Sequence, residues 1–128
     1  MRLDHRARVE DRHRRRFERL LGVTLRRLPP GFERYLDNVA FLVADDPTPE
    51  QRAASQLQPD ETLYGLYEGT PRINRGIVGP LVPDRITIFR HPIEAEFSSD
   101  KEITEEIRRT IIHEVAHHCG FEEDQLPF

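Results

Sequence analysis

The feature that most constrains the fold is a long stretch without proline or glycine that ends at Gly120. Ser98 or Ser99 can cap a helix here, because a serine side chain accepts a hydrogen bond from the free backbone N–H groups of the first turn. Acidic residues follow in that turn, where the helix dipole favours negative charge. The pattern predicts a long helix from about Asp100 to His118 that glycine ends.

Two histidines and a glutamate within this predicted helix have the spacing of a metal site. His113 and His117 are four residues apart, so both side chains lie on one face, about one turn from each other. Glu114 is rotated by roughly 100° from His113, which suits a base that acts on metal-activated water. The motif therefore predicts zinc bound by His113 and His117, with Glu114 as general base. Two unconnected histidines on a solvated helix face are the alternative.

A third metal ligand is expected just after the helix, since catalytic zinc usually takes three protein ligands and one water. Gly120 can turn the chain sharply, and the carboxylates of Glu122, Glu123 and Asp124 follow. Glu123 occupies the eleventh position of the pattern His-Glu-x-x-His-x-x-Gly-x-x-ligand. We expect Glu123 to be the third ligand, with Asp124 as the alternative and Glu122 facing solvent. A solvated acidic tail is the other interpretation of this cluster.

Further residues near the motif have less specific roles. His118 points about 100° away from His117, so we expect it to support the site or face solvent. Cys119 is the only cysteine, which excludes an intramolecular disulfide and a cysteine-based zinc cluster, and its apolar neighbours predict a core position. Spacing singles out no residue to stabilise an oxyanion, although four candidates lie on or beside predicted strands: Tyr64, Tyr67, Arg90 and His91.

The rest of the sequence predicts a mixture of helices and strands. Apolar residues at helical spacing predict a first helix from about Asp4 to Leu21 that stops at Gly22. Runs of β-branched and aromatic residues predict strands. The further expected elements are a short helix at 32–38, a buried strand at 39–43, strands at 63–69 and 86–90, and loops at 45–60 and 74–83. This order predicts one α+β domain over residues 1–128.

Charge is distributed unevenly along the chain. Residues 1–27 contain ten Arg and four acidic residues, whereas the whole chain has a net charge of −4. We favour a basic helix that lies against an acidic body; a basic arm for an acidic partner is the alternative. The overall charge makes nucleic acid an unlikely partner. No apolar run fits a signal peptide or a membrane span, so the sequence predicts a cytoplasmic protein without membrane contact and leaves the oligomeric state open.

Several segments together resemble a family of small bacterial zincin-like metallopeptidases, the minimal zincins. The segments are the helix motif, Leu66-Tyr67-Glu68-Gly69, and Pro83-Asp84-Arg85-Ile86-Thr87-Ile88-Phe89-Arg90 followed by Pro92-Ile93-Glu94. They cover about residues 63–124. Family members typically have Asp where this chain has Glu123, a change that keeps a carboxylate but adds a methylene.

The resemblance implies a fold and a function. The implied fold is zincin-like α+β, with a small mixed sheet flanked by helices and the metal-binding helix near the C-terminus. The implied function is a zinc-dependent peptidase that hydrolyses peptides or unfolded protein segments, and the substrate is expected to bind along an edge strand. The alternative is a metal-stabilised peptide- or protein-binding module with the zincin fold and little catalytic activity.

Overall fold

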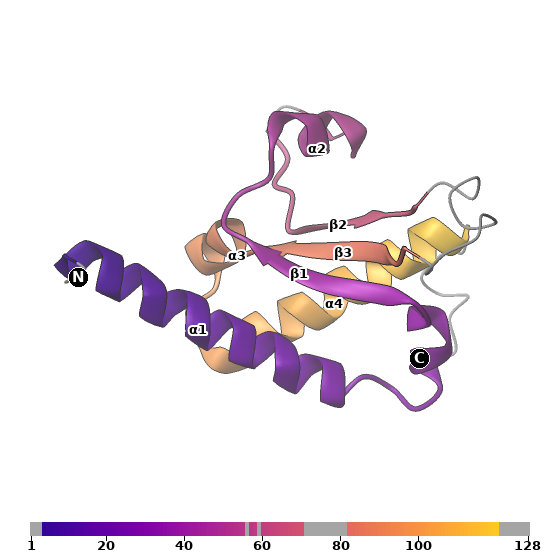
Figure 1. Cartoon of the computed structure of the whole chain (residues 1–128), viewed down its shortest axis with the longest axis horizontal. Helices are drawn as coiled ribbons and strands as arrows, with labels where there is room; N and C mark the ends of the chain where they lie inside the picture. Colours follow the sequence, from indigo (N-terminus) through magenta and orange to yellow (C-terminus); the bar gives the residue numbers. More distant parts are fainter. Residues whose placement is uncertain (1–3, 56, 59, 71–81, 121–128) are drawn as a thin grey trace.

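The computed structural model describes residues 4–55, 57–58, 60–70 and 82–120, and Figure 1 shows the order of its elements. A capped helix begins the described chain, and a second long, capped helix ends it. In chain order the elements are α1 (His5–Arg26), a 3₁₀ helix η1 (Phe32–Leu36), β1 (Val39–Ala44), α2 (Pro49–Ala54), β2 (Gly65–Glu68), β3 (Asp84–Phe89), α3 (Arg90–Glu96) and α4 (Asp100–Cys119).

Within the described residues the sheet has three strands in the order β1-β3-β2, so β3 is central and the other two are edges. β1 runs parallel to β3 and places Phe41 opposite Ile86, whereas β2 runs antiparallel and places Tyr67 opposite the same residue. Successive side chains of a strand point to opposite faces. One face therefore carries Ile86 and Ile88, and the other carries Thr87 and Phe89.

The long helix α4 packs against the isoleucine face of the sheet. Ile103, Ile107, Ile111 and Val115 recur every four residues, and each is at most 1% exposed. They share one core with the strand residues Ile86 and Ile88 and with a group from α1: Phe17, Leu20 and Leu21. Burying one such side chain contributes roughly 1.5–3 kcal/mol relative to leaving it exposed. This core fixes which face of α4 points away from the sheet.

The expected α+β class with a small mixed sheet is confirmed, and α4 matches its prediction closely. Ser99 is the N-cap and forms a capping box with Glu102, and Gly120 ends the helix at a φ of 78°. A glycine tolerates this left-handed conformation because it has no Cβ. The strands also lie where their residue types placed them, although β1 is an edge strand and only partly buried.

Three details of the predicted helices and loops are wrong. α1 continues through Gly22 to Arg26, because Leu21 and Thr24 are buried against the rest of the fold. The expected loop at 45–60 contains α2, which begins with a capping box between Thr48 and Gln51. The strand predicted to reach Arg90 ends at Phe89, where α3 begins. The loop expected at 74–83 lies mostly outside the described residues.

Ion pairs hold α1 against the body of the protein. Arg14 pairs with Asp45 at 2.6 Å, and Arg16 pairs with Asp100 at 2.6 Å, so α1 is tied to the end of β1 and to the start of α4. These contacts support the interpretation of a basic helix lying against acidic partners in the same chain. Among the described segments, no helix is both long enough and apolar enough to cross a bilayer.

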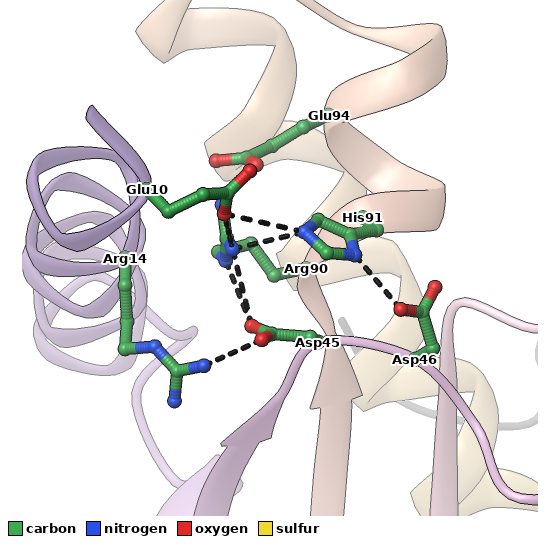
Figure 2. A network of polar contacts seen from close by, with 7 residues as sticks. All are labelled: Glu10, Arg14, Asp45, Asp46, Arg90, His91 and Glu94. Atoms are coloured by element: carbon green, nitrogen blue, oxygen red, sulfur yellow. Dashed lines mark hydrogen bonds and ion pairs between the residues drawn. The ribbon is translucent and has the colours of Figure 1, made fainter. Parts of the chain in front are cut away.

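A polar network, which we call the Arg90 hub, joins α1 to the carboxyl ends of the parallel strands (Figure 2). Arg90 is 1% exposed and contacts three carboxylates: Asp45 at 3.1 Å, Glu94 at 2.7 Å, and Glu10 of α1. Beside it, the Nδ1 atom of His91 lies 2.8 Å from Asp46. The buried guanidinium is compensated on several sides, as a buried charge requires.

The hub also shifts two pKa values in opposite directions. Hydrogen bonding to the Asp46 carboxylate, and to a smaller extent to Glu10, raises the pKa of His91 above its ordinary value. Hydrogen bonds from Arg90 and then His91 lower the pKa of Glu10. His91 therefore lies between two carboxylates, those of Asp46 and Glu10, which favour its protonated form.

On the other edge of the sheet, β2 approaches α4 so closely that only glycine fits at position 65. A Cβ there would lie 2.6 Å from Thr110 Cγ2 and 3.1 Å from the Thr87 carbonyl oxygen. We expect Gly65→Ala to lower the free energy of unfolding by about 1–3 kcal/mol, because overpacking forces β2 and α4 apart. Gly22→Ala is the control: it lies inside α1 with its nearest neighbour at 3.5 Å, and it should stabilise by roughly 0.5–1 kcal/mol. Urea denaturation measures both changes, and equal effects would contradict this account.

The raised pKa of His91 predicts a pH-dependent contribution to stability. A group whose pKa is raised by folding stabilises the folded state below its unfolded pKa, and this contribution is lost as pH rises through the folded value. His91→Gln should therefore cost more stability at about pH 5.5 than at about pH 8.5. The difference should stay below about 1 kcal/mol, since the side chain is 40% exposed. When Asp46→Asn is already present, the pH-dependent part of the stability loss caused by His91→Gln should become smaller. If urea titrations show that this part is unchanged, the result contradicts the role given to the Asp46 contact.

Candidate metal centre and cleft

A cleft opens between α4 and the chain segments that lead into β2. It encloses about 430 Å³. One wall comes from the chain before and within β2: Ser55, Leu57, Glu61, Thr62, Leu63, Tyr64 and Gly65. The other wall is a face of α4 beside its buried isoleucines, and it carries Glu106, Arg109, Thr110, His113, Glu114 and His117.

The two predicted metal-binding histidines and the predicted base all line this cleft. His113 and His117 are exposed and lie one helical turn apart. Glu114 is partly buried between them and β2. The burial of Ile111 and Val115 in the core fixes the rotation of α4, and this rotation brings the three side chains to the cleft.

The carboxylate of Glu114 is held by the backbone of the edge strand. Its Oε1 atom accepts a hydrogen bond of 2.8 Å from the Tyr67 backbone N–H. A hydrogen bond to a charged carboxylate is stronger than one between neutral groups, so this contact fixes the side chain.

The direction of the β2 backbone follows from its pairing with β3. The Tyr64 carbonyl accepts a hydrogen bond of 2.9 Å from the Phe89 N–H. Backbone groups alternate in direction along an antiparallel strand, so those of Gly65 and Tyr67 point away from β3. The Tyr67 N–H goes to Glu114, and Gly65 borders the cleft. The cleft therefore has a strand edge along one side.

The far end of the α4 wall is polar. Glu106 is 6% exposed, and Arg109 lies 2.9 Å from its Oε1. The Thr110 hydroxyl donates to the other oxygen of Glu106 at 3.3 Å. Glu106 is two turns before His113, so the same helix face carries both. Burial is the largest cause that raises the pKa of Tyr64, and the negative charges of Glu96 and Glu106 raise it further.

The other residues singled out from the sequence lie in the Arg90 hub or at the end of α4. Arg90 and His91 belong to the Arg90 hub and do not line the cleft. His118 points away from the cleft wall and stacks on the Tyr67 ring, with centroids 3.9 Å apart. Cys119 is exposed, so the expected core position is wrong: Val115 and Ala116 are the last buried residues of α4, and the residues from His117 to Cys119 lie at the surface.

The predicted third ligands cannot be placed, because Glu122, Glu123 and Asp124 lie outside the described residues. Within residues 4–120, as far as they are described, no three His, Cys, Asp or Glu side chains form a group that could hold a metal ion. The described part of the site thus supplies a pair of imidazoles. Gly120 ends α4 directly before the three carboxylates.

The donors present fit a divalent transition metal. Imidazole suits zinc, and His113 and His117 present two imidazoles on an exposed face that borders a cavity. Glu114 is fixed beside them by a backbone donor rather than by a cation. Two protein nitrogens leave coordination positions for a carboxylate and for water, which is the pattern of a catalytic zinc site.

Sequence reasoning did not identify the Tyr67 N–H, Gly65 or Glu106 as parts of this site. A backbone donor carries no residue-type signal, so only the fold reveals it. The sequence could have predicted Glu106, because it lies seven residues before His113 and therefore on the same helix face.

Comparison with known proteins identifies the family. Residues 36–127 match the family described as zincin-like metallopeptidase, and this region includes all of β1, β2, β3 and α4. Among curated proteins, no sequence is similar enough to count as a relative.

One solved structure shares the fold. It is a conserved hypothetical protein from Thermus thermophilus, with a TM-score of 0.51 and 20% sequence identity. The similar region covers 81% of this chain and 91% of that one. At this identity the likeness concerns the fold alone. The family match spans 92 of the 128 residues, and the chain belongs to the zincin-like metallopeptidase family.

Proposed function

We propose that this protein is a zinc-dependent peptidase, with His113 and His117 as metal ligands and Glu114 as general base. One observation carries the proposal: the two histidines and Glu114 line the same cleft, and a backbone N–H of its edge strand fixes the Glu114 carboxylate at 2.8 Å. The third ligand would be Glu123, with Asp124 as the alternative. Both are within four residues of Gly120.

The side chains of the cleft suit peptide hydrolysis. Zinc, when bound, supplies a Lewis acid that polarises a carbonyl and makes water more acidic. Glu114 takes the proton of the attacking water on Oε2 and later gives it to the leaving amine, because its Oε1 is engaged by Tyr67. The strand edge at Gly65 can bind the main chain of the substrate by hydrogen bonds.

An extended peptide or an unfolded protein segment is the substrate class that fits this cleft. Main-chain pairing with β2 requires an extended backbone, which a folded helix does not offer. The cleft is open on one side and has apolar walls from Leu57, Leu63 and Tyr64. It therefore suits a chain that passes through rather than an enclosed small molecule.

Replacing the base tests the mechanism. Glu114→Gln should lower the rate of hydrolysis of fluorescein-labelled casein by about 10²–10⁴-fold, while the purified protein still takes up one zinc ion per chain by elemental analysis. His117→Ala should lose both zinc and activity, and a chelator should abolish wild-type activity. His13→Gln, on the exposed side of α1, is the control and should behave as wild type.

Two outcomes distinguish the alternatives. If Glu114→Gln leaves hydrolysis unchanged, the proposed role of Glu114 is wrong. If the wild-type protein binds zinc and becomes more stable, yet cleaves no peptide, the metal-stabilised binding module is the better description.

A further inference from the structure

We propose that Tyr67 is a positioning residue, whose side chain anchors the edge strand so that its backbone holds Glu114 in place. This inference rests on the proposed function, because it concerns the residue assigned there as general base. Tyr67 lies in β2 and contacts β3 through Asp84 and α4 through Glu114 and His118.

The backbone of Tyr67 contributes to this role through its hydrogen bond to Glu114, the proposed base. The Tyr67 N–H points away from β3 and donates to Glu114 Oε1 at 2.8 Å. Its direction is fixed by the strand, so the position of the Glu114 carboxylate depends on where β2 lies. A shift of the strand moves the donor and releases the carboxylate.

The side chain of Tyr67 holds β2 against its two neighbouring elements, β3 and α4. The Tyr67 hydroxyl donates to Asp84 Oδ2 at 2.6 Å, at the beginning of β3. The ring stacks on His118 of α4, with a centroid distance of 3.9 Å and an interplanar angle of 17°. One side chain thus connects β2 to its partner strand and to the helix that carries Glu114.

Asp84 is a rigid acceptor for that hydroxyl. It is 7% exposed, and its Oδ1 accepts a second hydrogen bond, of 2.8 Å, from the Thr70 N–H. The Thr70 hydroxyl donates to the Pro83 carbonyl at 2.9 Å. The Asp84 N–H itself donates to the Asn38 carbonyl, which precedes β1. The acceptor is therefore tied to both edges of the sheet.

The strand needs such an anchor because it is short. β2 has four residues and pairs with a strand on one side only, and strand ends of this kind open at low cost in free energy. Beyond Tyr67 the chain passes close to α4: a Cβ at Gly69 would lie 3.3 Å from His118 Cε1. The contacts of Tyr67 hold this end of β2 against the last turns of α4.

Hydrogen exchange of two neighbouring amides tests the proposal directly. The Tyr67 N–H is protected by Glu114, whereas the Leu66 N–H faces β3. In the full chain, with and without zinc, Tyr67→Phe should speed exchange of the residue 67 amide by about 5–20-fold relative to that of Leu66. Tyr35→Phe removes the same hydroxyl from η1, outside the cleft, and should change neither amide. Equal exchange at residue 67 in wild type and Tyr67→Phe overturns the proposal.

Zinc affinity and kinetics separate positioning from metal binding. Tyr67→Phe should keep the zinc dissociation constant within about threefold, and should lower kcat for labelled casein by roughly tenfold with little change in KM. A loss of zinc affinity equal to the loss of kcat would show a structural role at the metal instead. If the wild-type chain proves inactive, the proposed function fails, whereas the exchange experiment still decides whether Tyr67 holds Glu114.

Discussion

The burial of one face of α4 is the constraint on which the rest of the structure depends. Ile103, Ile107, Ile111 and Val115 are buried against the sheet, and a helix has one rotation about its axis that buries all four. This rotation places His113 and His117 on the exposed part of α4 that borders the cleft. If α4 were rotated by a quarter turn about its axis, His113 and His117 would lie in the core or in the solvent away from the cleft. Core packing and the candidate site are therefore two consequences of one amphipathic pattern.

The edge strand β2 completes the cleft, and its position follows from a close approach. Gly65 lets the strand pass within contact distance of Thr110, and two residues later the Tyr67 N–H reaches Glu114. Both contacts need the strand and the helix to run side by side at the same separation. A side chain at position 65 would widen that separation, which would weaken the hydrogen bond to Glu114. The position of the Glu114 carboxylate therefore depends on the position of the β2 edge.

The Arg90 hub lies at the carboxyl ends of β1 and β3, and its residues do not line the cleft. Its buried guanidinium brings together α1, the end of β1 and the start of α3 through Glu10, Asp45 and Glu94 (Figure 2). α1 precedes the region that matches the family, which begins at residue 36. The helix nevertheless contributes Phe17 to the common core. Apolar packing and compensated charge act together to hold this helix against the rest of the protein.

The sequence by itself determined the elements whose signals are local. The caps and apolar spacing of α4, the β-branched run of β3 and the one-turn spacing of His113 and His117 are properties of neighbouring residues. It missed α2 and α3, which are short, and it predicted a core position for Cys119, although the buried part of α4 ends at Ala116. Tertiary structure alone decided that Tyr67 meets Glu114 and that Arg90 and His91 lie in the hub away from the cleft. These pairs are 47 residues apart or involve three elements at once, and contacts over such separations are set by packing rather than by the local pattern.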